Sequence, residues 1–178
     1  GKDQLQHLEI TRSVANKFNH QNGDTFIVPE SRVDKNTMLI AGTDGNKMSK
    51  SKKNIIDIFL EEKLLKKQIS NIKTDSLPLE ASKDWKNCNL FKMYKLLADE
   101  EETEMMKKNY TKGGYGYGHA KTDLLNLILT KYSSEREKYT FYMSNLDKID
   151  SILNAGALQA SKTADEVLNR VRIKVGFN

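Results

Sequence analysis

The sequence predicts a mainly α-helical chain that begins with a small α/β segment. After residue 54, apolar side chains recur at helical spacing through most of the chain, which predicts a series of helices. Only two segments, 25–28 and 37–41, have the length and apolar character of short buried strands. A chain of 178 residues forms one domain or two small ones, and the change of pattern favours two.

The first part of the chain reads as a helix, two short strands and a loop. Apolar residues near a 3.6-residue period predict a helix over about 5–18, and the Asn-Gly pair at 22–23 ends it. The two strand-like segments follow, with a proline between them. Residues 42–46 contain two glycines, an aspartate and an asparagine, and this composition predicts a loop.

The second part reads as helices joined by short links. Asn54 is a good N-cap for a helix whose apolar residues continue to Ile69. The box Thr163-x-x-Glu166 has the spacing that starts a separate last helix. Further helices are predicted over 87–98, 100–109, 120 to about 132, 146–158 and 163–175, with a turn at 74–78 and a glycine-rich link at 112–118.

Composition limits the kind of site and the compartment. The single Cys88 excludes a disulfide within the chain, and the three histidines are too scattered to predict a metal site. No apolar run approaches the roughly 20 residues of a membrane span, and the first residues lack a signal-peptide core. We therefore expect an intracellular, cytoplasmic protein that makes no contact with membranes. The net charge of +5 suits nucleic acid but is also typical of a solvated surface.

Charge is more informative locally, because four of the seven residues 47–53 are lysines with no acid among them. The segment Lys47–Ser51 reads KMSKS, which places two ammonium groups three residues apart beside two hydroxyls. Such a loop can neutralise the charge that develops on a polyphosphate during nucleotidyl transfer. On the residues alone, a solvated surface loop is the alternative.

A second basic set lies in the predicted helical region. It could contact phosphates, but acidic residues are interleaved with it, and this pattern favours a solvated face. The set comprises Lys121, Lys131, Arg136 and Lys138.

The KMSKS string is the signature of class I aminoacyl-tRNA synthetases, and other stretches resemble bacterial tryptophanyl-tRNA synthetases in particular. The pattern GxDQxxHxExTR at residues 1–12 is similar to a stretch of that family. The remaining similar stretches run nearly end to end in the family's order. They are KFNHQNGDTFIVPE from Lys17, GTDGNKMSKSKKNIIDIF from Gly42, IKTDSLPLE from Ile72, CNLFKMYKLL from Cys88 and GGYGYGHAK from Gly113.

The resemblance implies two domains. Residues 1–53 would be the C-terminal remnant of a Rossmann-type catalytic domain, with a helix, one or two short strands and the KMSKS loop. Residues 54–178 would be an all-helical domain that binds the tRNA anticodon. The family's enzymes act with ATP and Mg²⁺, activate tryptophan to tryptophanyl-adenylate, and transfer it to tRNA(Trp), and the whole enzyme is expected to be a homodimer.

The resemblance also implies roles for particular residues. Lys47 and Lys50 would be catalytic, stabilising the pentacovalent α-phosphate and the departing pyrophosphate. Gln4 would lie between nucleotide and tryptophan, and so would contact both substrates. The implied ATP-binding residues are Gly1, Lys2, Asp3, Gln4, Met38, Leu39, Ile40, Lys47, Met48, Ser49, Lys50 and Ser51.

The other end of the family's nucleotide site is missing from this sequence. There is no HIGH-type motif and no carboxylate to read the indole N–H, and the family's chains are nearly twice as long. We therefore expect a C-terminal portion that cannot form the adenylate alone. Two alternatives remain: a non-catalytic helical RNA-binding module, and a tyrosyl-tRNA synthetase, which shares the Asp-Gln pair but has a looser KMSKS and lacks HxExTR.

Overall fold

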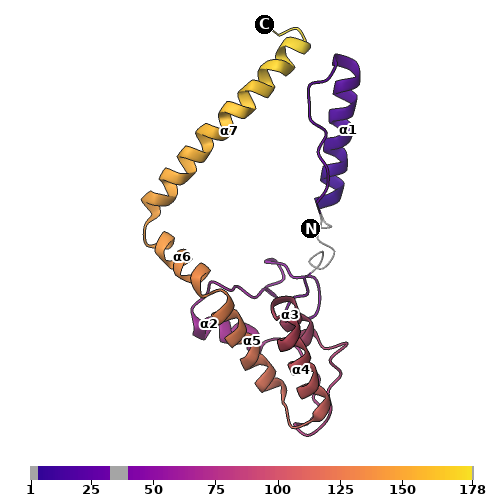
Figure 1. Ribbon diagram of the computed structural model, residues 1–178, viewed down its shortest axis with the longest axis vertical. Helices are drawn as coiled ribbons and strands as arrows, with labels where there is room; N and C mark the ends of the chain where they lie inside the picture. Colours follow the sequence, from indigo (N-terminus) through magenta and orange to yellow (C-terminus); the bar gives the residue numbers. More distant parts are fainter. Residues whose placement is uncertain (1–3, 33–39, 178) are drawn as a thin grey trace. The chain divides into compact units, whose positions relative to one another are not determined.

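The computed structural model describes residues 4–32 and 40–177, and these residues confirm the mainly α prediction (Figure 1). The chain divides into two compact units, Leu39–Thr140 on the one hand and Gly1–Met38 with Phe141–Asn178 on the other. No described helix is long and apolar enough to cross a membrane. The helices of the described residues are α1 (Leu5–Asn22), α2 (Glu62–Ser70), α3 (Asn89–Leu97), α4 (Glu100–Lys112), α5 (Tyr117–Lys131), α6 (Ser133–Met143) and α7 (Leu146–Lys174).

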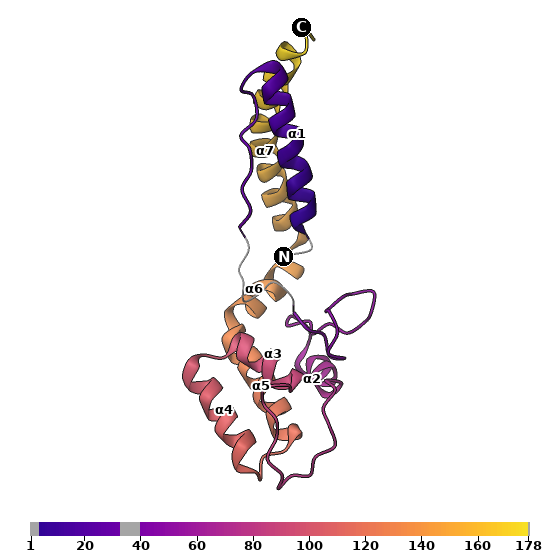
Figure 2. The same ribbon diagram turned by 90° about the vertical axis from the view of Figure 1, so that its right-hand side faces the viewer.

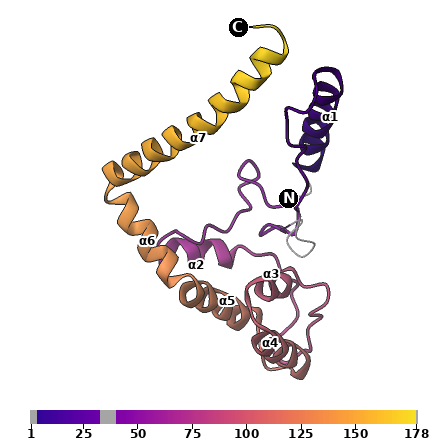
Figure 3. The ribbon, with the colours of Figure 1, turned by 45° about the horizontal axis from the view of Figure 1, so that its top comes forward.

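The core of the unit 39–140 lies between four helices. Helix α5 packs against both α2 and α3, and α3 also contacts α4 (Figure 3). Each helix turns a short apolar stripe inward, as expected for amphipathic helices around one core. The buried side chains on these helices are Leu65, Ile69, Leu90, Phe91, Met93, Tyr94, Met106, Tyr110, Ala120, Leu124, Leu125 and Ile128.

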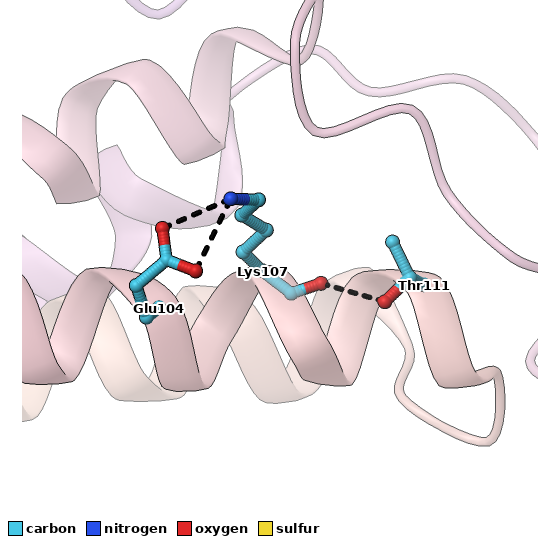
Figure 4. A network of polar contacts seen from close by, with 3 residues as sticks. All are labelled: Glu104, Lys107 and Thr111. Atoms are coloured by element: carbon cyan, nitrogen blue, oxygen red, sulfur yellow. Dashed lines mark hydrogen bonds and ion pairs between the residues drawn. The ribbon is translucent and has the colours of Figure 1, made fainter.

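Helix α4 shows why its sequence starts a helix where it does. The Asp99 side chain accepts from the backbone N–H of Glu102, and the Glu102 carboxylate accepts from the backbone N–H of Asp99, which completes a capping box. On the exposed face, Lys107 donates to Glu104, and its carbonyl accepts from the Thr111 hydroxyl (Figure 4). The helix runs to Lys112, three residues beyond its predicted end.

The predicted helix start at Asn54 is wrong. Helix α2 begins only at Glu62, and residues 54–61 form an irregular segment. Ile56, Ile58 and Leu60 of this segment still pack against the core, so its apolar pattern reflects burial and not a helix. Carbonyls that a helix would have used accept instead from the Arg136 guanidinium, at Ile58 and, over 2.8 Å, at Leu60.

Two helical boundaries near the C-terminus also differ from prediction. The segments 146–158 and 163–175 form the single helix α7 of 29 residues. Residues 159–162 between them are Gln-Ala-Ser-Lys, which a helix accommodates, so the capping box at Thr163 is not used to start one. The glycine-rich link is shorter than predicted, because α5 already begins at Tyr117.

In the other unit, α1 is followed by a segment that runs back along it (Figure 2). The Asn19 side chain accepts from the backbone N–H groups of Thr25 and Phe26 and donates to the Phe26 carbonyl. The rings of Phe18 and Phe26 pack edge to face, 5.0 Å apart. Residues 25–28 are therefore not the predicted strand, because a side chain takes the backbone groups that a neighbouring strand would pair.

Part of the second predicted strand lies outside the described residues. Of its residues 37–41, only Ile40 and Ala41 are described, and Ala41 forms an isolated antiparallel bridge with Lys47.

Candidate functional site

The KMSKS loop is organised by one buried side chain, Asn54, which is 3% exposed. Its Oδ1 accepts from the backbone N–H of Ser49 over 2.8 Å. Its Nδ2 donates to Asp44 Oδ1 over 2.7 Å and to the Lys47 carbonyl over 3.1 Å. An amide is both donor and acceptor, so this one side chain joins three points of the loop.

The entry and exit of the loop are held as a short hairpin. Beside the bridge between Ala41 and Lys47, the N–H of Met48 donates to the Ile40 carbonyl over 2.9 Å. At the tip, the Gly42 N–H donates to the Asn46 carbonyl over 2.6 Å. The backbone of the first KMSKS lysine is therefore fixed on both sides.

Asp44 is the acidic member of this loop. Its carboxylate accepts from the side-chain amides of Asn46 and Asn54 and from the backbone N–H of Asn46. These hydrogen bonds favour the charged form, with the side-chain bond from Asn46 the largest cause, and they lower the pKa of Asp44 to about 2. The carboxylate is ionised at neutral pH and holds the loop as an acceptor only.

The second half of the motif forms a turn. The hydroxyls of Ser49 and Ser51 are hydrogen-bonded over 2.7 Å, and the Lys53 N–H donates to the Lys50 carbonyl over 3.1 Å. Lys53 takes a φ of 53°, the left-handed conformation that closes the turn. Both Lys47 and Lys50 are exposed, and both lie on a backbone that these hydrogen bonds hold.

Two further hydrogen bonds attach the loop to the helices of the same unit. The Asn89 side chain, at the first residue of α3, donates to the Gly42 carbonyl over 2.8 Å. The N–H of Lys73 donates to the Thr43 carbonyl over 2.8 Å. The loop and the helical core thus belong to one compact unit, which spans the predicted domain boundary at 53/54. That boundary stays a prediction.

The predicted site residues divide into three groups. Ile40 and the five KMSKS residues come together in the loop described above. Gln4 is exposed and lies directly before α1, in the other unit. The rest of the predicted set lies outside the described residues: Gly1, Lys2, Asp3, Met38 and Leu39.

The sequence did not reveal the roles of Asn54 and Gly42. A Cβ on Gly42 would lie 2.7 Å from the backbone carbonyl oxygen of Asn54. Asn54 can therefore occupy this position only beside a glycine. Asn54 occurs where an N-cap is plausible, and an asparagine that caps a helix cannot be told by pattern from one that organises a loop.

The second basic set is largely structural. Lys121 donates to the carbonyl of Ser70, at the end of α2, over 2.7 Å, and burial lowers the pKa of this lysine. Lys131 donates to the Leu97 carbonyl, and Arg136 holds the segment before α2. Cations at helix C-termini satisfy carbonyls that the helix leaves open. Among the described residues, no group of three His, Cys, Asp or Glu side chains could hold a metal ion.

Comparison with known proteins gives this loop a family. The family model of "tRNA synthetases class I (W and Y)" matches residues 1–132. The chain belongs to this family. The KMSKS loop and the helices α2 to α5 that hold it all lie within the matched range.

Curated relatives in this family are similar over almost the whole chain. The tryptophan–tRNA ligase of Campylobacter jejuni is 47% identical over 99% of this chain, and that of Fusobacterium nucleatum is 42% identical over 99%. These matches cover 56% and 54% of the relatives, so the chain spans about half of their length. The chain corresponds to their C-terminal part.

Solved structures agree. A tryptophanyl-tRNA synthetase from Campylobacter jejuni, complexed with ADP and tryptophan, is 46% identical with a TM-score of 0.86, covering 99% of this chain and 55% of that one. The enzyme from Mycoplasma pneumoniae is 23% identical with a TM-score of 0.70, covering 100% of this chain and 55% of that one, and shows the shared fold.

Proposed function

We propose that this chain is the C-terminal portion of a tryptophan–tRNA ligase, and that its KMSKS loop acts on the phosphates of ATP. The observation that carries the proposal is the loop itself: two exposed lysines of the motif extend from a backbone that Asn54 fixes. The relatives that match over 99% of the chain are named tryptophan–tRNA ligases, and this favours an enzyme over a non-catalytic RNA-binding module.

The chemistry that this loop supplies is electrostatic. When the carboxylate of tryptophan attacks the α-phosphate, negative charge builds up on the phosphate oxygens and on the departing pyrophosphate. Lys47 and Lys50 neutralise that charge, with Mg²⁺ bound to ATP, and the hydroxyls of Ser49 and Ser51 donate hydrogen bonds. A prearranged backbone reduces the reorganisation needed at the moment of reaction.

The remaining assignments belong to the same proposal. The stretch before α1 contributes to the ATP site, with Gln4 between nucleotide and tryptophan, and the backbone at 38–40 holds the adenine. The helices after residue 53 contact tRNA(Trp), which receives the activated tryptophan. The whole enzyme works as a homodimer in the cytoplasm. The 178 residues alone are inactive, because the site also needs groups that this chain does not carry.

The test joins this chain to the N-terminal part of the Campylobacter jejuni relative and measures amino-acid-dependent ATP–pyrophosphate exchange. We expect exchange with tryptophan and none with tyrosine, and no exchange by the 178 residues alone. Exchange by the chain alone, or tyrosine-dependent exchange by the fusion, contradicts the proposal.

Lysine variants of the fusion test the loop. Lys47→Ala and Lys50→Ala should each lower kcat about 100-fold, the loss expected when one transition-state charge partner is removed. Lys52→Ala is the matched control, because Lys52 is an exposed lysine of the same cluster outside the motif, and its kcat should stay within about twofold. Equal losses of kcat in all three variants would show that the lysines act only as general surface charge.

A further inference from the structure

An acidic hollow lies between α3, α4 and α5, away from the KMSKS loop. It is a cavity of about 510 Å³ lined by Tyr94, Asp99, Glu102 and Asp123, together with polar residues of α5. The same four residues also line an adjoining hollow of about 250 Å³, to which Glu101 contributes. A phosphate would be repelled by these carboxylates, so this is not a surface for nucleic acid.

Tyr94 makes this hollow different from the acidic first turn of an ordinary helix. Its side chain is only 8% exposed, and the hydrogen bonds of the described residues include none to its hydroxyl. Among the described residues, no fully buried side-chain N or O atom lacks a hydrogen-bond partner. The unpartnered Tyr94 hydroxyl is therefore not fully buried, and it opens on the hollow that Tyr94 lines. Most of this side chain is buried, but its hydroxyl has no protein partner in the described part of the chain and remains available to a group that occupies the hollow.

The carboxylates around this hydroxyl retain free acceptor positions. Asp99 and Glu102 each use an oxygen in the capping box, and Asp123 accepts from the Tyr115 hydroxyl. A carboxylate has about four acceptor sites, so each of the three can take further donors. Burial raises the pKa of Tyr94, and the nearby charges of Glu102, Asp123 and Asp99 raise it further.

The charge and shape of the hollow select the ligand. The lining carries three carboxylates against one ammonium, that of Lys131, which is bonded to the Leu97 carbonyl. Among the described residues, no three acidic or histidine side chains are close enough to hold a metal ion. What fits is a flat or extended organic cation with several N–H donors.

We propose that the α3–α4–α5 hollow binds an organic cation, a guanidinium or alkylammonium group, through Tyr94, Asp99, Glu102 and Asp123. The donors of the cation reach the free carboxylate oxygens, and the Tyr94 hydroxyl, acting as an acceptor, completes the set. The cation is either a free polyamine or an arginine or lysine side chain of a protein partner. This site is independent of the ATP chemistry proposed above.

The experiment is an NMR titration of the ¹⁵N-labelled 178-residue chain with spermidine and with arginine amide, at constant ionic strength. We expect saturable shifts confined to residues of α3, α4 and α5. Saturation by arginine amide shows that an amino-acid side chain suffices, and saturation by spermidine alone assigns the site to a free polyamine. Shifts that grow linearly and match those caused by sodium chloride overturn the proposal.

Two variants and two controls test the residues. Asp123→Asn should weaken binding about tenfold and Tyr94→Phe about threefold, as expected for a charge-assisted and a neutral hydrogen bond. Asp75→Asn is matched to the first, because Asp75 also accepts from a tyrosine hydroxyl, that of Tyr117, but lies outside the hollow. Glu104→Gln removes a carboxylate of α4 that instead pairs with Lys107 (Figure 4).

Both control variants should bind like the parent chain. A loss of affinity in the controls equal to that of Asp123→Asn would mean that the cation senses only the overall charge, and the assigned site would be wrong. Spectra of each variant outside α3, α4 and α5 report whether the fold is retained, so a folding defect is separated from a loss of binding.

Discussion

Two irregular segments of the unit 39–140 are each organised by one buried polar side chain, but the two side chains are chemically different. Asn54, 3% exposed, holds the KMSKS loop, and Lys83, 2% exposed, holds the segment between α2 and α3. The Lys83 ammonium donates to the carbonyls of Pro78 and Leu79, both over 3.3 Å, and of Ala81 over 3.0 Å. It also lies 5.5 Å from the centre of the Tyr117 ring.

The difference between the two follows from what each segment needs. The Lys83 segment presents only carbonyls, so three donors from one ammonium satisfy it. The KMSKS loop presents an N–H, a carbonyl and a carboxylate, so only a group that both donates and accepts can serve all three. An amide also adds no charge beside the lysines of the motif. The functional loop is thus held by a neutral residue, and the supporting segment by a cation.

The largest expected effect is at Lys83. Lys83→Met keeps most of the side-chain volume but leaves three carbonyls without their donor, which should lower the free energy of unfolding by about 3 kcal/mol. Lys86→Met is the control, because Lys86 is an exposed neighbour over the Trp85 ring and should cost less than about 1 kcal/mol. Urea denaturation followed by circular dichroism measures both. Equal costs would remove the distinction between a buried organiser and a surface lysine.

A smaller effect is expected from a pair of glycines in the KMSKS loop. Gly42→Ala places a Cβ against the side-chain amide of Asn54, closer than van der Waals contact allows, and 2.7 Å from the backbone carbonyl oxygen of Asn54, so Asn54 must move, at about 2 kcal/mol. At Gly45 there is open space but a φ of +85°, so Gly45→Ala should cost about 1 kcal/mol from conformation alone. The same denaturation measures both variants.

A double-mutant cycle identifies the cause. If Gly42→Ala acts by displacing the Asn54 side chain, its cost should fall when Asn54→Ala is already present, leaving only the part that comes from the Asn54 backbone carbonyl, whereas the cost of Gly45→Ala should not change. Additive costs for Gly42→Ala and Asn54→Ala would show that the position of the Asn54 amide does not depend on the glycine.

The smallest effect depends on pH. The pKa of Asp44 is lowered from 3.8 to about 2, so the folded loop favours the charged carboxylate. Its contribution to stability is present above about pH 4 and is lost as pH falls towards 2. The NMR resonance of the Asn46 amide, which donates to Asp44, should titrate with a midpoint near 2, and Asp44→Asn should abolish that titration.

The Lys83 segment provides the reference for this titration. The Gly114 N–H donates to the Leu79 carbonyl over 3.0 Å, and the described hydrogen bonds of Lys83 involve no carboxylate. The amide resonance of Gly114 should therefore not follow the Asp44 titration. An Asn46 midpoint near 4 would show that the loop does not favour the charged form.

Helices that depend on their own sequence were predictable. Helix α4 begins at Glu100, where its sequence predicted, and the predicted stop at Asn22-Gly23 ends α1. The predictions failed where a distant group takes the backbone carbonyls, and where a helix continues through a local cap signal. Residues 54–61 carry a helical apolar pattern, yet Arg136 takes two of their carbonyls, and the Thr163 box lies within one continuous α7.

The candidate site divides in the same way. By itself the sequence determined the family, the KMSKS motif and the two lysines that we expect to meet phosphate, because these are written in adjacent residues. Only the tertiary structure decided that Asn54 holds the loop instead of starting a helix, that Gly42 makes room for it, and that α3 anchors Gly42. The hydrogen bonds of Asn54 reach back 5 to 10 residues, and that of Asn89 reaches 47, so a helix-cap pattern records neither.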